Sequence, residues 1–297
     1  MVAMDSLNSS QPQARDLVEL DEFPAAAGWK EHASLKGIAA DLEELARTHK
    51  ATFQSASPWP HVVFDDLIDP ALIAAAEREE LEPSLALEVE RNYRKVKAES
   101  PQPNGPAAQQ ILESIGSAEF VAFLEELTGV SGLTPDPTHY WAGLHVNPPG
   151  AFQAIHRDFR VHPITGLFHR VNILIYLNSD WKSEYAGELE LWKPDRSACE
   201  KQVPPLAGKS VIFDAGARAI HGIPEPIRCP TGRARLSLAA IYYTVDPPPN
   251  DQKESRFFRP KRPQDPWYMG FGTFGDAVNL VRRTIERRSA TKSTPGG

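Results

Sequence analysis

The stretch AIHRDFR, residues 154–160, contains two side chains that can bind a metal ion. His156 offers an imidazole and Asp158 a carboxylate, two positions further along the chain. The chain has 9 His in 297 residues, so chance alone supplies about half a His-x-Asp pair. The pair indicates a metal site only if a residue elsewhere in the chain completes it.

His221 is a candidate for the missing third ligand. In AGARAIHGIPEP it follows a short apolar stretch and precedes glycine and proline, a pattern typical of a strand that ends in a turn. Two imidazoles and one carboxylate on one face of a non-haem Fe(II) leave three coordination positions open for a bidentate substrate and O₂. The three residues suit that chemistry if the fold brings distant strands together.

An arginine in the last apolar stretch predicts an anion site. In GRARLSLAAIYYTV, Arg235 and Ser237 point to the same face of a strand, because side chains alternate along it. A guanidinium there is costly unless an anion pairs with it, and the distal carboxylate of 2-oxoglutarate is a suitable anion. In RVNILIYLN the same alternation places Asn172 and Tyr176 on one face, with the Tyr176 hydroxyl as a second donor and Asn172 nearer the metal.

Short strands between residues 133 and 246 must position these side chains. Apolar segments recur there at short intervals, separated by clusters of Pro, Gly, Asn and Asp. They are THYWAGLHV, AFQAIHRD, RVNILIYLN, GELELW, KSVIFD, AIHGI and RLSLAAIYYTV. This pattern favours a β-sandwich or barrel of the jelly-roll kind.

Helices precede these strands. Helical spacing predicts a first helix from Ser34, and PWPHVVFDDLI predicts a strand followed by a helix that Asp69-Pro70 opens. Two further helices follow in AAQQILESIG and SAEFVAFLEELTG, with Ser117 as N-cap and Gly129 as the end of the second. The charged, Pro-rich residues from about 83 to 105 are assigned neither helix nor strand.

The predicted fold class is α+β, with a double-stranded β-helix (jelly-roll) core, N-terminal helices packed outside it and a short C-terminal helix. Four parts follow from the pattern: a flexible arm at 1–33, a helical lead-in at 34–132, the catalytic core at 133–246 and a partly disordered C-terminal extension at 247–297. The extension carries locally basic segments, which we interpret as solvated surface.

Composition disfavours polyanionic partners and bears on the location and redox chemistry of the protein. The net charge of −7 gives no general electrostatic reason to bind nucleic acid or an anionic membrane. No apolar run approaches the roughly 18 residues of a membrane span, and the N-terminus lacks the pattern of a secretion signal, so we expect a cytoplasmic protein. Cys199 and Cys229 are too few for a disulfide framework or a thiolate metal site. Nothing in the sequence indicates the oligomeric state.

The motifs also occur in a recognisable order. His-x-Asp, RVNILIYLNSDW, GELELW, GKSVIFD, IHGIPEP and GRARLSLAAIYYT together resemble the 2-oxoglutarate/Fe(II) dioxygenase superfamily, specifically its prolyl 4-hydroxylase-like branch. The resemblance covers about residues 135 to 245, and PWPHVVFDDLIDPALI resembles the lead-in of that branch more loosely. One departure is Ala186-Gly187, where relatives commonly have Gly-Gly, and an alanine disfavours the positive φ that a glycine allows.

The resemblance implies a role for each candidate residue. His156, Asp158 and His221 would hold Fe(II), Arg235 would bind the distal carboxylate of 2-oxoglutarate, and Tyr176 and Ser237 would assist it. Asn172 and His145 are the remaining expected co-substrate-binding residues. O₂ is the second co-substrate, with ascorbate as a reductant. Because Asp158 is present, the expected reaction is hydroxylation of a C–H bond rather than halogenation, on an amino-acid side chain, free or in a peptide, or on a small biosynthetic intermediate.

Two other functions remain open. A cupin-like hydrolase or isomerase would hold Zn²⁺ in the same triad, and a non-catalytic module would sense a carboxylate ligand. Among the other histidines, His162 is interpreted as a loop residue, and His169, like Arg170, as either a pocket-rim or a structural residue. No catalytic role is expected for His32, His49, His61 and His139.

Overall fold

The computed structural model describes residues 36–91, 95–100, 103–136, 138, 141–216 and 218–248. Its helices are α1 (Leu42–Ser55), α2 (Pro70–Ser84), α3 (Pro106–Ile115), α4 (Ala118–Thr128) and the 3₁₀ helix η3 (Ser183–Tyr185). Its strands are β1 (His61–Phe64), β2 (Glu90–Arg91), β3 (Lys95–Ser100), β4 (Thr134–Pro135), β5 (Gly143–Asn147), β6 (Phe152–His156), β7 (Phe168–Tyr176), β8 (Leu189–Trp192), β9 (Cys199–Val203), β10 (Ser210–Asp214), β11 (Ile220–Ile223) and β12 (Arg235–Thr244). The predicted arm at 1–33 and the predicted C-terminal helix lie outside the described residues.

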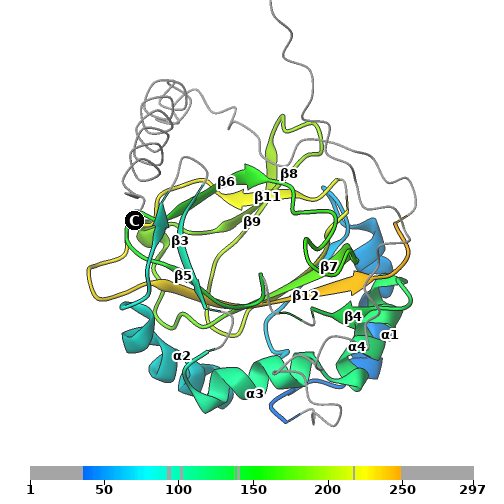
Figure 1. The fold of residues 1–297 in the computed structure, drawn as a ribbon, viewed down its shortest axis with the longest axis horizontal. Helices are drawn as coiled ribbons and strands as arrows, with labels where there is room; N and C mark the ends of the chain where they lie inside the picture. The colour runs from blue at the N-terminus through cyan, green and yellow to red at the C-terminus, as the bar shows by residue number, and fades with distance from the viewer. Residues whose placement is uncertain are drawn as a thin grey trace, which may run out of the picture.

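The strands form two facing layers (Figure 1). One layer follows the order β1-β10-β7-β12-β5, and the other follows β6-β11-β8-β9. Strand β3 pairs with β5 on one edge and with β6 on the other, so that it connects the two layers. Every pairing between these strands is antiparallel, as expected for the predicted jelly roll.

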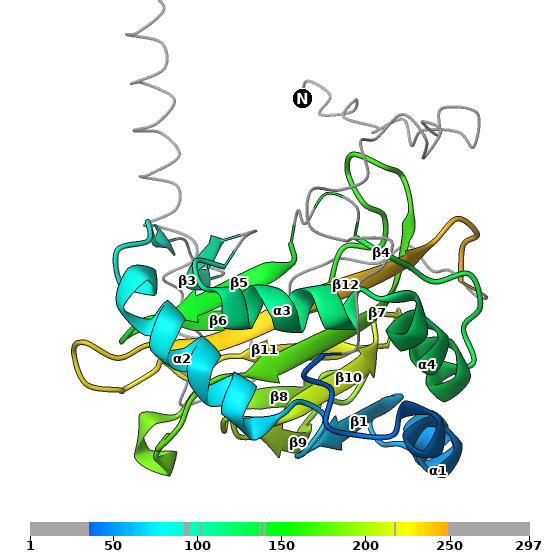
Figure 2. The ribbon, with the colours of Figure 1, turned by 90° about the horizontal axis from the view of Figure 1, so that it is seen from below.

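The helices cover the outer face of one layer (Figure 2), where α3 lies across β12. Strand β7 shows why the two faces differ: Val171, Ile173 and Ile175 pack into the large core under the helices, whereas Tyr176 belongs to a second cluster between the layers. Tyr242 also faces the helices, and its hydroxyl donates a 2.6 Å hydrogen bond to the carbonyl oxygen of Ile115. The structured helices are too short or too polar to cross a membrane.

Local capping explains most of the helix ends. Asp69 accepts a hydrogen bond from the amide of Ala71 at the start of α2, and Ser117 accepts one from Phe120 at the start of α4. Gly129 ends α4 with a φ of 75°, the left-handed conformation that glycine favours. These predicted caps are confirmed.

The prediction of a helix from Ser34 is wrong in its start. Helix α1 begins at Leu42, and the carboxylate of Asp41 caps it by accepting a hydrogen bond from the amide of Glu44. Gly37 has a φ of 95°, and its carbonyl oxygen accepts a 2.8 Å bond from the amide of Asp69. Ile38 is therefore held beside Ile68 in an isolated β-bridge instead of in a helix.

Strand β3 was not predicted, although it lies at the centre of the fold. Ala98 packs into the core under the helices, and the buried Lys97 faces the other way, toward His145 on β5. Alternation was present in KVKAES, but the alternating residues are largely charged. The segment between residues 83 and 105 therefore gave the signal of an exposed linker.

Candidate active site

The three predicted metal ligands meet at the ends of two paired strands. His156 ends β6, His221 lies in β11, and the two are register partners. Their rings are 4.5 Å apart, and Asp158 follows β6 so that its Oδ1 lies 3.3 Å from Nε2 of His156 and its Oδ2 lies 3.7 Å from Nε2 of His221. One donor atom from each residue lies within 4.8 Å of the others, a spacing that could hold one metal ion.

Backbone carbonyl groups set the tautomer of both histidines. Nδ1 of His156 donates to the carbonyl oxygen of Ala154 at 2.8 Å, and Nδ1 of His221 donates to that of Ala219 at 3.1 Å. In the neutral form of each ring the proton therefore resides on Nδ1, and Nε2 carries the lone pair that can bind a metal. Bonds of this kind orient metal-ligating histidines.

The same surroundings shift the pKa values of His221 and Asp158. Burial lowers the pKa of His221 to about 4, although the Asp158 carboxylate opposes that change. Burial alone would raise the pKa of the Asp158 carboxyl, but the neighbouring rings of His221 and His156 outweigh it and hold the pKa well below its usual range. A neutral imidazole and an ionised carboxylate are the forms that bind cations.

Arg235 is buried between the layers, as predicted, and none of the described residues places an anionic group in contact with it. Its Nε donates to the carbonyl oxygen of Gly187 at 2.7 Å, its Nη1 donates to Oδ1 of Asn147 at 3.2 Å, and its guanidinium carbon lies 4.8 Å from the centre of the Tyr176 ring. Burial lowers the pKa of this guanidinium. A fully buried cation of this kind needs a negative charge nearby.

Three hydrogen-bonding groups around this guanidinium are buried and have no hydrogen-bond partner among the described residues: Nη2 of Arg235, the hydroxyl of Tyr176 and Nδ2 of Asn147. Ser237 is also buried there and lies opposite Tyr176 in the sheet. Unpaired buried donors are costly, at about 1–3 kcal/mol each. A carboxylate accepts several hydrogen bonds at once, so the co-substrate implied by the sequence fits this set of donors.

Asn147 is a residue that sequence reasoning missed. It is the register partner of Arg235, at the end of β5. In the sequence it precedes two prolines, so it gave the signal of a turn residue. Its pairing with Arg235 could be found only from the strand register.

Both residues of the Ala186-Gly187 turn before β8 have a positive φ. Ala186 has a φ of 56°, and Gly187 follows with a φ of 91°. Gly187 is the residue whose carbonyl oxygen accepts the bond from Arg235. The alanine therefore adopts a conformation that suits glycine, and the turn still reaches the anion site.

His145 lies opposite Ser237 on the inner side of β5, close to the predicted co-substrate site. Its Nε2 donates to the carbonyl oxygen of Trp141 at 3.1 Å, and its Nδ1 lies 3.4 Å from Nζ of Lys97. Lys97 in turn contacts Glu99 at 2.5 Å. Burial lowers the pKa of His145 to about 3, and the charge of Lys97 contributes in the same direction. The ring is thus neutral and held on both sides.

Asn172 lies nearer the metal ligands than the anion site. Its Nδ2 donates to Oδ2 of Asp158 at 2.6 Å, and its Oδ1 lies 2.7 Å from Nε2 of His169. His169 is therefore buried beside the metal ligands, not exposed on a pocket rim.

His162 lies between β6 and β7, as predicted for a loop residue, but it is buried and organises that loop. Its Nδ1 accepts the backbone amides of Ile164 and Thr165, and its Nε2 lies 3.4 Å from the buried carboxylate of Asp136. Burial would raise the pKa of Asp136, but the bonds from His162 and Thr138 outweigh it and lower the pKa. The loop that follows Asp158 is thereby held to Asp136, the residue that follows β4.

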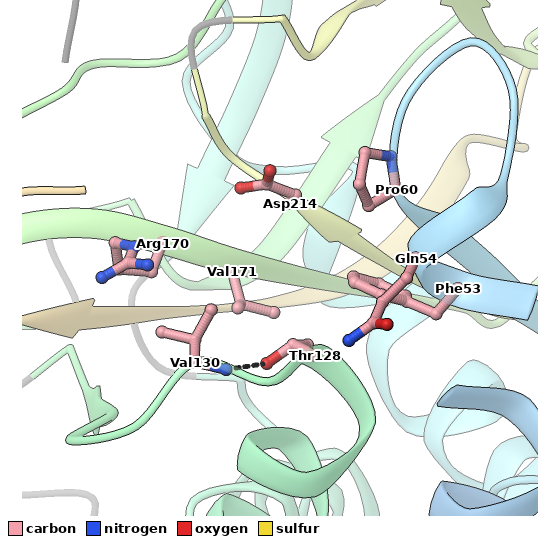
Figure 3. Close-up of a pocket in the computed structure, with 8 residues that line it drawn as sticks. All are labelled: Phe53, Gln54, Pro60, Thr128, Val130, Arg170, Val171 and Asp214. Atoms are coloured by element: carbon pink, nitrogen blue, oxygen red, sulfur yellow. Dashed lines mark hydrogen bonds between the residues drawn. The ribbon is translucent and has the colours of Figure 1, made fainter. Parts of the chain in front are cut away.

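Arg170 lines a separate cavity of about 140 Å³ on the outer face of the sheet (Figure 3). Phe53, Val130 and Val171 form apolar walls of this cavity, and Asp214 lies across from Arg170. The lining of this cavity includes none of His156, Asp158 and His221, and its wall residues Phe53 and Val171 belong to the core under the helices. This cavity is therefore not part of the site around His156.

Comparisons with known proteins agree with this geometry. A family model described as the 2OG-Fe(II) oxygenase superfamily matches residues 142–243, which contain every residue predicted for the site. A comparison with curated proteins gave no significant match.

Several solved structures are similar. A prolyl hydroxylase from Trichoplax adhaerens, in complex with a hypoxia inducible factor oxygen degradation domain peptide fragment, is 14% identical over 68% of this chain and 90% of that one, with a TM-score of 0.50. A Pseudomonas putida prolyl-4-hydroxylase is 21% identical over 68% of this chain and 96% of its own, with a TM-score of 0.47. HygX from Streptomyces hygroscopicus, with nickel, 2-oxoglutarate and hygromycin B bound, is 15% identical over 67% and 87%, with a TM-score of 0.44.

The matched residues contain a His-Asp-His group that can hold a metal and a buried arginine with unpaired donors around it. The Trichoplax adhaerens enzyme shares the fold. Fe(II), 2-oxoglutarate and O₂ are the cofactor and co-substrates that the family description implies. Residues 142–243 therefore belong to the 2OG-Fe(II) oxygenase superfamily and share the fold of a prolyl hydroxylase, and the chain is a 2-oxoglutarate-dependent dioxygenase.

Proposed function

We propose that this chain hydroxylates an unactivated C–H bond of an amino-acid side chain, free or within a peptide, or of a small biosynthetic intermediate. The observation that carries the proposal is the buried guanidinium of Arg235, whose Nη2 has no hydrogen-bond partner within the described part of the chain and which lies in the same interior as the proposed metal ligands. Tyr176 connects the two places, because its cluster includes Phe213, whose ring contacts His221.

Each residue has a distinct task in this reaction. Nε2 of His156, Nε2 of His221 and the carboxylate of Asp158 would hold Fe(II). When bound, the metal supplies the activation of O₂, which is coupled to decarboxylation of 2-oxoglutarate and oxidation of the C–H bond. Arg235 would bind the distal carboxylate through its two η nitrogens, which match a carboxylate in geometry.

The remaining neighbours orient the co-substrate and exclude water. Asn147 and Tyr176 would each donate one hydrogen bond to the same carboxylate, and Ser237 lies beside them. Leu189, Leu191 and Phe213 give the interior an apolar wall next to Tyr176. A dry wall strengthens every electrostatic contact within the site.

A titration followed by a reaction tests the proposal. Fe(II) and 2-oxoglutarate, mixed with the protein without oxygen, should give a visible metal-to-ligand charge-transfer band, and admission of O₂ should then produce succinate. Asp158→Ala should lose the band, and Arg235→Gln should require a much higher concentration of 2-oxoglutarate. A zinc hydrolase or a carboxylate sensor would form no succinate. The absence of succinate would therefore contradict the proposed function and favour one of these two alternatives.

The substrate requires a separate screen. The Trichoplax adhaerens enzyme holds a peptide, so proline-containing peptides are the first candidates to test, followed by free amino acids. The readout is substrate-stimulated succinate formation, with the added oxygen located by mass spectrometry. Three expectations from the sequence stay predictions: that ascorbate acts as a reductant, that nucleic acids and membranes are not partners, and that the protein is cytoplasmic.

A further inference from the structure

An amide on the central strand β7 contacts the metal-binding carboxylate. Nδ2 of Asn172 donates to Oδ2 of Asp158 at 2.6 Å, a short bond of the kind that a charged acceptor makes. Asn172 is buried, with β10 on one side of its strand and β12 on the other. An amide is costly at such a position unless both of its ends are bonded.

His169 satisfies the other end of this amide. A carboxylate has only acceptors, so the contact with Asp158 fixes Nδ2 on that side and leaves Oδ1 to accept a 2.7 Å bond from Nε2 of His169. The second ring nitrogen of His169 lies 3.0 Å from the carbonyl oxygen of Phe159, the residue that follows Asp158. The backbone amide of His169 donates to the carbonyl oxygen of Arg160 at 2.9 Å.

These contacts restrain Asp158 from two directions. Its side chain is held through Asn172, and the next two residues of its loop are held through His169. The ring of Tyr243 packs against His169 at 5.3 Å between ring centres and limits its movement. Side chains that bond a ligand from behind commonly change metal affinity by about 10–100-fold when they are replaced.

We infer that Asn172 and His169 are positioning residues for the metal, and that Asn172 keeps Asp158 a one-oxygen ligand by occupying Oδ2. Oδ1, which lies 3.3 Å from Nε2 of His156, is then the oxygen that faces the metal. A carboxylate that bound through both oxygens would take one of the three positions needed by 2-oxoglutarate and O₂. The inference rests on the proposed function, because it requires the triad to hold a metal.

Cobalt(II) binding tests the inference without turnover. We expect Asn172→Leu to bind Co(II) about 10–100-fold more weakly than the unchanged protein, with an altered visible absorption spectrum, which reports coordination number. His169→Gln keeps a donor near Asn172 and should restore most of the affinity that His169→Phe loses. His169→Phe also preserves a ring against Tyr243, so Co(II) binding by this variant tests the inference if Asn172→Leu does not fold.

Asn178→Ala is the matched control. Asn178 is another buried amide just beyond β7, and it bonds the carbonyl oxygens of Pro205 and Leu236 but no metal ligand. It should lower stability and leave the cobalt spectrum unchanged. Cobalt affinity and spectrum equal to those of the unchanged protein in Asn172→Leu and His169→Phe would overturn the inference. If the unchanged protein bound no Co(II) or Fe(II), the metal centre itself would be wrong, and the proposed function would fall with it.

Discussion

Arg235 and Asn147 lie opposite each other on β12 and β5, and the arginine fixes the orientation of the amide. Nη1 of Arg235 donates to Oδ1 of Asn147 at 3.2 Å. Because a guanidinium has only donors, the amide must present its oxygen to Arg235 and leave Nδ2 as a donor with no partner. We therefore expect the two side chains to bind the carboxylate of the co-substrate together.

Asn147→Asp should weaken 2-oxoglutarate binding more than Asn147→Ala does. The new carboxylate would pair with Arg235 and repel the co-substrate, whereas alanine removes one donor to a charged group, which is worth about 1.5–3 kcal/mol, or roughly 10–100-fold in affinity. Anaerobic titration of the Fe(II) form by its charge-transfer band measures this. Equal affinity in Asn147→Asp and the unchanged protein would exclude Asn147 from the site.

Gly222→Ala should disrupt the metal centre. A Cβ at this position would lie 2.8 Å from Cα of Ile155 and 2.9 Å from the carbonyl oxygen of Gln153, so β6 would have to move away from β11. His156 and His221 are partners across that pair of strands. Overpacking of this kind costs about 1–3 kcal/mol, and we expect a lower Tm together with weaker Co(II) binding.

Gly132→Ala is the control for that change. A Cβ there meets no heavy atom within 4 Å, although the φ of 72° still strains an alanine. It should lower stability slightly and leave metal affinity unchanged. Equal metal affinities in Gly222→Ala and Gly132→Ala would show that the contact between β6 and β11 does not position the two histidines.

His145 should make stability depend on pH. Its pKa is about 3 in the folded chain, below the ordinary value of 6.5, so the unfolded chain binds more protons between these two values. The neutral ring therefore stabilises the fold above about pH 6.5, and that contribution is lost as the pH falls toward 3. The charged groups around it are Lys97, Glu99 and Arg235.

Urea unfolding at several pH values, compared between the unchanged protein and His145→Asn, checks this prediction. Asparagine retains a donor for the carbonyl oxygen of Trp141 and does not titrate. The variant should show a smaller loss of unfolding free energy between pH 6.5 and pH 4. Parallel curves for the two proteins would mean that His145 does not contribute.

Ala186→Gly should stabilise the chain. Ala186 has a φ of 56° and a ψ of −155°, a region that is essentially restricted to glycine and costs another residue about 1–3 kcal/mol. Glycine loses about 0.5–1 kcal/mol more backbone entropy on folding, so the net gain is smaller. Thermal unfolding should show a higher Tm, and a lower Tm would indicate that the methyl group contributes packing that outweighs the strain.

The grouping of these candidate residues could be predicted because burying their polar or charged side chains on apolar strands costs free energy unless they have a partner. His156, Asp158 and His221 were brought together as expected, and Arg235 proved to be buried. Strand alternation was enough for this part of the prediction, because an arginine on an apolar strand already requires an anion.

The interior face of the barrel was harder to predict, because it is polar. On β3 the inward residue Lys97 is charged, and this inverts the usual rule that buried positions are apolar. Asp136 and His162 were missed for a related reason: their burial depends on a contact between distant loops, which no local pattern reports. Residue spacing predicts which side chains share a face of a strand, but not which of the two faces points into the interior between the layers.

Strand β3 has a consequence for which acid the enzyme accepts. Along one edge it is bonded to β5, which carries Asn147 beside the carboxylate-binding arginine, and along the other it is bonded to β6, which ends in His156. The width of this one strand therefore contributes to the distance between Arg235, the proposed anchor for one end of the co-substrate, and the three proposed metal ligands. If Arg235 binds one end of the acid and the metal binds the other, we expect the backbone hydrogen bonds of β3 to help determine whether a dicarboxylic acid of four, five or six carbons fits.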